Sequence, residues 1–332
     1  MIATKPCLDT LESLSFSDAP YVMTPLPGPK SSELLARQSS RESNARTYPR
    51  GLPIAPAQAR GATLMDVDGN LFLDCLAGAG TLGVGHNNPY VLDAVRRFLD
   101  TDHIVSSLDF PTEPKNRFVE TLFDILPQEL REHGRIQFCG PTGSDAVDAA
   151  IKLAKTATGR HEVIAFQGAY HGMGQGPLAL MGATAPKEKL GALLPGVHFM
   201  PYANCTRCPL KLKPGICGHA CAHMLGSALE DGHSGITKPA AIIVEAIQGE
   251  GGSIVPPKGW LKTIAGYARK HDVPLICDEI QSGMGRTGKW FAFEHEGIVP
   301  DILLLSKSLG GLGLPISVVI YHEKLDQWSP GA

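Results

Sequence analysis

The chain has 332 residues, 43% apolar and 19% charged, which is typical of a well-packed globular protein with one large domain or two smaller ones. The net charge of -3 does not favour nucleic acid or an acidic membrane surface as a partner, and no apolar run approaches the roughly 18 residues of a membrane span. The first thirty residues lack a secretion signal and eight cysteines are few for a disulfide scaffold, so we expect reduced thiols and a cytoplasmic setting.

The N-terminal part of the sequence differs from the rest. Residues 1–60 are rich in Pro, Ser and Arg with weak periodicity, which predicts an extended N-terminal arm with at most one short helix. Residues 61–75, GATLMDVDGNLFLDC, alternate apolar and polar side chains around Asp68 and Gly69. This pattern predicts a β-hairpin. We therefore expect a boundary near residue 60 and one large domain over residues 61–332.

Helical and strand patterns alternate through that large domain. Helical spacing is found in residues 89–100, 112–126, 144–158 and 258–271. Short β-branched runs predict strands in residues 135–139, 161–166, 240–247, 273–279 and 301–307. Such alternation indicates an α/β fold, with a mixed, mostly parallel sheet covered by helices on both faces. Ligands of such folds bind beyond the carboxyl ends of the strands, so the residues that follow each strand are the candidates for function.

The first of these strand ends is followed by the sequence GPTGSD, residues 140–145, which opens a helix. Free backbone N–H groups at a helix N-terminus favour an anion, and Gly143 would let a phosphate approach closely. The alternative is a glycine turn in which Ser144 caps the helix.

Two further strand ends carry aromatic and acidic side chains. Tyr170 and His171 follow residues 161–166, and an aromatic ring there would either stack on a planar ligand or fill the core. Asp278, Glu279 and Gln281 follow the strand at 273–279. A carboxylate in this place either caps the next helix or pairs with a buried cation.

The last strand ends at Lys307, which lies between two serines and is followed by a loop with three glycines. A lysine there is costly unless its charge is paired or its pKa falls. A lowered pKa gives a nucleophilic amine that forms a Schiff base with an aldehyde. The alternative is a lysine whose stem is buried while its ammonium group reaches water.

Taken together, the four strand ends describe a single ligand. It has a phosphate, a flat aromatic ring, a basic ring nitrogen that needs a carboxylate and an aldehyde that needs a lysine. Pyridoxal 5'-phosphate has all four features. The sequence therefore predicts that Lys307 holds this cofactor and that the glycines beside it leave room for it.

Several segments, in order along the chain, resemble the class III aminotransferases, a family of fold-type I pyridoxal-phosphate enzymes. They are LAGAGTLGVGHNNP, GPTGSDAVDAAIKLAK, AYHGM, VEAIQGEGG, CDEIQSGMGRTG and LLLSKSLGG. The resemblance covers residues 45–332. It implies an aminotransferase, and it implies a homodimer because active sites of the family lie at the subunit interface.

The resemblance also implies a role for each candidate residue. Lys307 would form the covalent link to the cofactor and move the proton in the transfer step. Asp278 would keep the pyridine nitrogen protonated, and Gln281 would lie near the phenolic oxygen. The remaining implied roles are stacking on the ring for Tyr170, phosphate binding for Gly143 and Ser144, shaping of the ring pocket for His171, and pairing with a substrate-gating arginine for Glu250.

Within the family, the segments YPRGLPIAPAQARGATLMDVDG and AFEHEGIVPDILLLSKSLGG are similar to the diaminobutyrate–2-oxoglutarate aminotransferases. The implied reaction exchanges the terminal amine of L-2,4-diaminobutanoate with 2-oxoglutarate, giving aspartate 4-semialdehyde and glutamate. Ornithine, acetylornithine or 4-aminobutyrate enzymes are the nearest alternatives. A pyridoxal-phosphate aminomutase or decarboxylase, or a fragment without activity, remains a further alternative.

The sequence departs from the family pattern in two places. It stops at DQWSPGA, where the resemblance implies a further segment and a C-terminal small domain, so we expect that small domain to be absent and the chain to be truncated. A cysteine-rich insertion spans residues 204–223 and contains Cys205, Cys208, Cys217 and Cys221. Their spacing resembles a small zinc knuckle. The alternative is a variable loop with incidental thiols.

Overall fold

The computed structural model describes residues 14–45 and 51–331 and divides the chain into two compact units. The first unit comprises residues up to Ser106 together with Gly311–Leu314, and the second comprises Ser107–Gly310 and the residues from Pro315 onward. None of the helices in the described ranges has the length and apolar character needed to cross a membrane.

The first unit contains a small antiparallel sheet with the strand order β1-β2-β3. Its elements are α2 (Pro29–Arg41), β1 (Pro56–Arg60), β2 (Thr63–Asp66), β3 (Leu71–Leu73), α4 (Ala77–Gly80) and α5 (Pro89–Leu99). Strands β2 and β3 pair antiparallel around Asp68 and Gly69, as the alternation predicts.

The predicted boundary near residue 60 falls inside this first unit rather than at its edge. The hairpin is bonded to the segment before it, because Asp68 accepts hydrogen bonds from the backbone N–H groups of Lys30 and Ser31 at 2.9 and 2.8 Å. Leu71 also exchanges backbone hydrogen bonds with Tyr21. These contacts join the hairpin to the N-terminal segment, so the boundary lies at Ser106.

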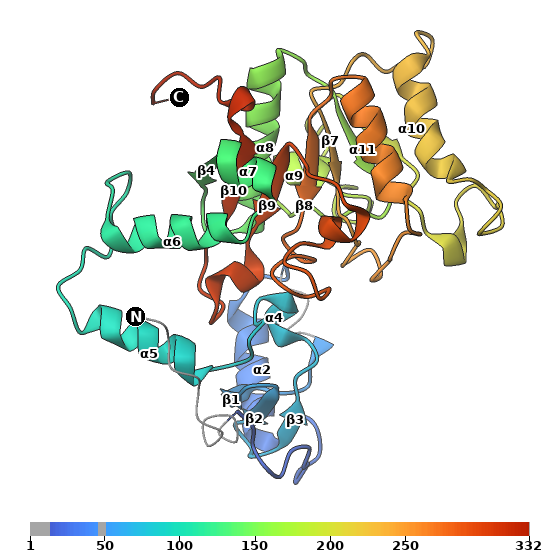
Figure 1. Cartoon of the computed structure of the whole chain (residues 1–332). Helices are drawn as coiled ribbons and strands as arrows, with labels where there is room; N and C mark the ends of the chain where they lie inside the picture. The colour runs from blue at the N-terminus through green and yellow to red at the C-terminus, as the bar shows by residue number, and fades with distance from the viewer. Residues whose placement is uncertain (1–13, 46–50, 332) are drawn as a thin grey trace. The chain divides into compact units, whose positions relative to one another are not determined.

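The second unit is built on a seven-stranded sheet with the order β4-β10-β9-β8-β7-β5-β6. Figure 1 labels the strands from β4 to β7 in this order. Its strands are β4 (Gly134–Phe138), β5 (Val163–Phe166), β6 (Val197–Met200), β7 (Ala241–Val244), β8 (Leu275–Asp278), β9 (Ile302–Leu305) and β10 (Val318–His322). Its α-helices are α6 (Glu113–Asp124), α7 (Gln128–His133), α8 (Gly143–Thr158), α9 (Gln175–Ala179), α10 (Ala220–Glu230) and α11 (Trp260–Lys270). Single-turn 3-10 helices are η1 (Cys205–Arg207), η2 (Ala292–Glu296), η3 (Lys307–Gly310) and η4 (Glu323–Leu325).

The direction of the strands decides where functional side chains meet. Strands β5 to β9 are parallel to their neighbours, whereas β10 pairs antiparallel with both β9 and β4. Strand β4 therefore runs in the same direction as β9. The carboxyl ends of β4, β5, β7, β8 and β9 consequently lie on one edge of the sheet.

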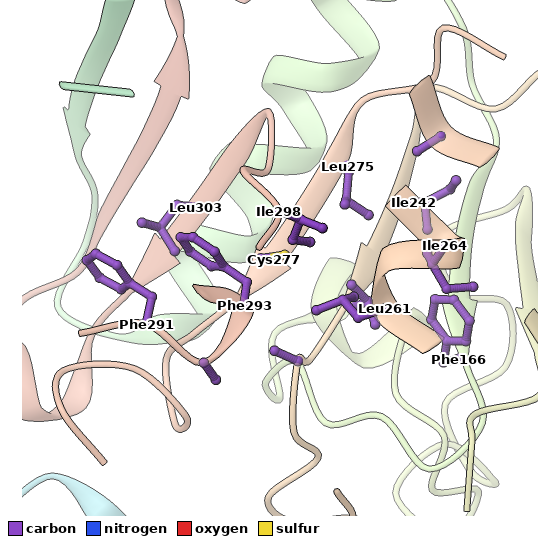
Figure 2. Packing of buried hydrophobic residues seen from close by; sticks show 14 of the residues in the cluster. Phe166, Ile242, Leu261, Ile264, Leu275, Cys277, Phe291, Phe293, Ile298 and Leu303 are labelled. Carbon is purple, nitrogen blue, oxygen red and sulfur yellow. The ribbon is translucent and has the colours of Figure 1, made fainter. Parts of the chain in front are cut away.

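The alternation of side chains along each strand sends them into two cores, one on each face of the sheet. On one face Ile242 and Val244 of β7 belong to the same apolar cluster as Leu261 and Ile264 of α11. Figure 2 shows part of this cluster, including Phe166, Leu275 and Leu303 of neighbouring strands. Burial of each such side chain contributes about 2 kcal/mol.

The opposite face is covered by α8. The intervening strand residues, Ala241 and Ile243 of β7 among them, pack with the buried side of this helix, which includes Val147 and Ile151. Strands that are buried on both faces cannot shift along their neighbours without exposing one core. The strand ends are thereby held at fixed positions relative to one another.

Candidate active site

Lys307 directly follows Ser306 at the carboxyl end of β9 and begins η3, with a left-handed backbone at φ 46°. Its Nζ donates a hydrogen bond to Oε1 of Gln281. Burial lowers the pKa of the Lys307 ammonium, while the negative charges of Glu250 and Asp278 act to raise it. Because burial has the larger effect, forming the neutral, nucleophilic amine costs less free energy here than it does on an exposed lysine.

Asp278 ends the neighbouring strand β8 and is paired with His171. Asp278 Oδ2 lies 2.7 Å from His171 Nδ1, and both side chains are buried. Burial alone would lower the pKa of His171, but its hydrogen bond to Asp278 and the charge of that carboxylate raise it. When protonated, His171 balances the negative charge that Asp278 places at the sheet edge.

His171 is also incompletely satisfied. Its Nε2 is buried and has no hydrogen-bond partner among the described residues. A buried polar atom of this kind is costly unless water or a ligand group meets it. A polar group of a ligand bound next to the Asp278–His171 pair would provide a partner for His171 Nε2.

Tyr170 follows β5 and is half-buried, and its backbone N–H donates to Glu245 Oε2 at 3.0 Å. Burial and then the nearby charge of Glu250 raise the pKa of its phenol. Tyr170 consequently keeps its proton at neutral pH and presents a neutral ring beside the buried acids.

The N-terminus of α8 lies at the same edge and contains Gly143 and Ser144. The Ser144 hydroxyl accepts a hydrogen bond from the backbone N–H of Gly174 at 3.0 Å, which ties the loop after Tyr170 to the helix. A Cβ on Gly143 would lie 2.8 Å from Ile280 Cδ1, so only glycine fits between the helix and the loop after β8. The first N–H groups of this 16-residue helix lack partners within the helix and, with its positive end, favour an anion.

Glu250 and Gln281 complete the group of predicted residues. Glu250 is exposed in the turn after β7, and its charge acts on both Lys307 and Tyr170. A Cβ on Gly249 would lie 2.5 Å from Gln281 Cδ, so this glycine allows Gln281 to approach the turn. The structure thus brings all seven predicted cofactor and gating residues to one edge of the second unit.

Two residues of this site were not among the predicted ones. Glu245, next after β7, is buried and close enough to act electrostatically on Lys307 and His171. Arg286 donates a hydrogen bond to Ser308 Oγ, and its positive charge acts to lower the pKa of Lys307. Glu245 lies inside the predicted strand 240–247 and was missed because β7 ends earlier, at Val244. Arg286 lies eight residues beyond Asp278 and is placed only by the folded loop.

The cysteine-rich insertion lies apart from these residues. Cys205, Cys208, Cys217 and Cys221 line one pocket together with His219 and apolar side chains. In the part of the chain that the structure describes, no three His, Cys, Asp or Glu side chains form a group that could hold a metal ion. The zinc knuckle that the spacing resembles stays a prediction.

Comparison with known proteins assigns the family. The model of the family described as aminotransferase class-III matches residues 45–332. A diaminobutyrate–2-oxoglutarate aminotransferase from Rhizobium meliloti is 52% identical over 298 residues, covering 90% of this chain and 63% of that protein. An enzyme of the same name from Haemophilus influenzae is 46% identical, with 89% and 64% covered. The chain thus spans slightly less than two thirds of the length of these relatives.

Solved structures agree with the family assignment. The ornithine aminotransferase of Toxoplasma gondii has a TM-score of 0.74 at 28% identity, covering 91% of this chain and 66% of its own. An omega-transaminase from Thermomicrobium roseum has a TM-score of 0.78 at 26% identity, with 90% and 67% covered. The predicted α/β fold, with a mixed, mostly parallel sheet and helices on both faces, is confirmed. The chain belongs to the class-III aminotransferase family.

Proposed function

We propose that the protein containing this chain is a pyridoxal-phosphate-dependent aminotransferase and that its second unit holds the cofactor. The observation that carries this proposal is the meeting of Lys307, Asp278 and the N-terminus of α8 at one sheet edge, with Lys307 bonded to Gln281. These groups match the aldehyde, ring nitrogen and phosphate of the cofactor. When bound, pyridoxal phosphate supplies an aldehyde for a lysine and a protonated ring that withdraws electrons from the substrate.

The residues of the chain would divide the work of binding and proton transfer. Gly143 and Ser144 would hold the phosphate through the first N–H groups of α8, and Tyr170 would lie against the ring. Asp278 would hold a proton at the ring nitrogen, while His171 keeps the Asp278 carboxylate in position. The amine of Lys307 would act as the base that takes a proton from the substrate carbon and gives it back. Gln281 orients the Lys307 amine, and Glu250 pairs with a basic group at the substrate entrance.

We propose L-2,4-diaminobutanoate as the amino donor and 2-oxoglutarate as the acceptor, giving aspartate 4-semialdehyde and glutamate. Two relatives with 52% and 46% identity bear the name of this activity, which supports the proposal. Ornithine-, acetylornithine- and 4-aminobutyrate-type enzymes are the competing assignments, and a structural relative is an ornithine aminotransferase. We further propose a cytoplasmic homodimer, which the family resemblance and the cysteine content support.

The decisive experiment is reductive trapping of the cofactor. Borohydride should fix pyridoxal phosphate covalently to the protein, and peptide mapping should place it on Lys307. Lys307→Ala should abolish the visible absorption band of the bound cofactor and lower turnover on the order of a thousandfold or more. An adduct on another lysine, or no adduct at all, would contradict the proposal.

The donor is tested separately, by adding amines to the cofactor-loaded protein without any 2-oxo acid. Diaminobutanoate should bleach the visible band faster than ornithine, acetylornithine or 4-aminobutyrate at equal concentration. A faster response to one of those three would reassign the donor while leaving the aminotransferase proposal intact. A band that no amine bleaches favours a protein that binds the cofactor without transamination.

A further inference from the structure

Three buried acids lie at the sheet edge of the second unit, and two of them have a role already. Asp278 is paired with His171. Glu279 accepts hydrogen bonds from Ser282 and from the backbone N–H groups of Ala292 and Phe293, so it holds η2. Glu245 remains, with 5% of its surface exposed, and neither the sequence motifs nor the proposed chemistry give it a task.

The carboxylate of Glu245 connects two loops that are far apart along the chain. Its Oε2 accepts a hydrogen bond from the backbone N–H of Tyr170 at 3.0 Å, across a separation of 75 residues. Its Oε1 accepts one from the backbone N–H of Gly249 at 3.2 Å. One side chain therefore anchors both the loop of the ring-covering Tyr170 and the turn that presents Glu250.

The surroundings of Glu245 are rigid on the side of its own strand. The Tyr202 hydroxyl donates to the backbone carbonyls of Glu245 and Ala246 at 3.0 and 3.2 Å. The two loops also touch directly, because Gln248 Nε2 donates to the carbonyl of Gln167 at 2.9 Å. The backbone at Glu245 is thus held by hydrogen bonds, and its carboxylate sets the distance between the Tyr170 loop and the Gly249–Glu250 turn.

Four ionisable groups act on Glu245. They are the positive charges of His171 and Lys307, the negative charge of Asp278 and the phenol of Tyr202. Burial raises the pKa of Glu245 to about 7, although His171 acts to lower it. Retaining an acid in such a place costs stability, which is expected where the group has a task in the site.

We propose that Glu245 is a positioning residue, whose two backbone hydrogen bonds hold the Tyr170 loop and the Gly249–Glu250 turn in the one arrangement that covers the cofactor and faces the substrate. This inference rests on the proposed function for the identity of the ligand. The arrangement of the loops themselves does not depend on that identity.

The test compares Glu245→Gln with Glu279→Gln as a matched control. Both acids are buried next to the ends of neighbouring strands, and each accepts two backbone hydrogen bonds. Glutamine has the same length but a single oxygen, so at Glu245 it can serve only one of the two N–H groups. The rate of amide hydrogen exchange, measured on the whole chain without cofactor, reports whether each of these N–H groups is hydrogen-bonded. Glu245→Gln should accelerate exchange about tenfold at Tyr170 or Gly249, and Glu279→Gln should do so at Ala292 or Phe293 instead.

A second measurement reports the position of the ring in the cofactor-loaded chain. The visible circular dichroism of bound pyridoxal phosphate depends on how the protein holds the ring. Glu245→Gln should reduce this signal per bound cofactor, whereas Glu279→Gln should leave it unchanged.

Each other outcome overturns the inference. Unchanged exchange at Tyr170 and Gly249 removes the proposed anchoring, and equal acceleration throughout the chain makes Glu245 a general stabiliser. Faster exchange with an unaltered dichroism signal shows that the loops do not position the ring. Failure to trap any cofactor on Lys307 would refute the proposed function, but it would leave the exchange result standing.

Discussion

Lys307 and Asp278 lie at neighbouring strand ends but differ in their surroundings. Burial lowers the pKa of the Lys307 ammonium and favours its neutral form. Asp278 is buried, and His171, which carries the opposite charge when protonated, lies 2.7 Å from it. The amine of Lys307 and the paired acid therefore lie at neighbouring strand ends.

The pairing of His171 with Asp278 leads to a prediction at this scale. In Asp278→Asn the charge that raises the pKa of His171 is lost, whereas the burial that lowers it remains. The pKa of His171 should therefore fall, and the histidine should titrate at a lower pH than in the parent protein. Histidine titration by NMR measures this change.

The control is Glu279→Gln, which also replaces a buried acid next to the end of β8 but leaves the hydrogen bond between His171 and Asp278 in place. The titration of His171 in this variant should match that of the parent protein. A His171 resonance that titrates at an unchanged pH in Asp278→Asn would show that Asp278 is not the source of the shift.

At the scale of elements, the parallel direction of the strands determines which residues can act together. Strand β10 runs opposite to its neighbours and brings β4 into the direction of β9. The loop that opens α8 consequently reaches the edge where β8 and β9 end. Because β10 pairs antiparallel with both neighbours, the anion site and the lysine lie on the same edge of the sheet.

The start of α8 gives a second prediction. In Gly143→Val the new side chain would press on Ile280, whose Cδ1 lies 2.8 Å from an added Cβ. Overpacking of this kind should lower stability by about 1–3 kcal/mol and, by shifting the first turn, should weaken cofactor binding. Urea unfolding and a pyridoxal phosphate titration measure the two effects.

Gly159, at the other end of α8, provides the matched control. It has a left-handed φ of 66°, and nothing lies within 4 Å of an added Cβ. Gly159→Ala should cost about 1–2 kcal/mol through backbone strain but should leave cofactor affinity unaltered. If both variants lose affinity equally, the loss reflects stability and the first turn of α8 has no part in binding.

At the scale of the whole molecule, buried acids make stability depend on pH. Burial raises the pKa of Glu279 from 4.5 to about 7. The folded state therefore holds this proton between these pH values while the unfolded state has released it. The contribution is fully present below pH 4.5 and is lost as the pH rises to about 7, with a magnitude of about 3 kcal/mol.

Glu279→Gln removes this titrating proton and gives a third prediction. The difference in unfolding free energy between parent and variant should shift in favour of the variant as the pH rises from about 4.5 to 7, and should be constant above that range. Other titrating groups are common to both proteins and cancel in the difference. Urea unfolding at a series of pH values provides the measurement, and a difference independent of pH would contradict the assignment.

The local sequence was sufficient for four helices, for five of the seven strands of the large sheet and for the residues at the ends of these strands. Helices α5, α6, α8 and α11 and strands β4, β5, β7, β8 and β9 lie where periodicity predicts them, because each has an apolar pattern of its own. Strands β6 and β10 were not predicted. Strand β10 has an apolar, β-branched run of its own, VVIYH, which the prediction missed. Strand β6, VHFM, has a weaker pattern and is identified by its pairing with β5.

The boundary between the units also depended on contacts over long distances. Composition changes near residue 60, but the hydrogen bonds from Lys30 and Ser31 to Asp68 join the two sides of that position. A change in composition reports local conformation, whereas a domain is defined by which segments bond to each other.

By itself, the sequence determined the alternation of the main helices and strands, the chemistry at the strand ends and the resemblance to the family, because these are properties of neighbouring residues. Only the tertiary structure decided that Asp278 pairs with His171, 107 residues away, and that Glu245 joins two loops. Such pairings depend on strand order and direction, which arise from the burial of both faces of the sheet. No local pattern along the chain records them.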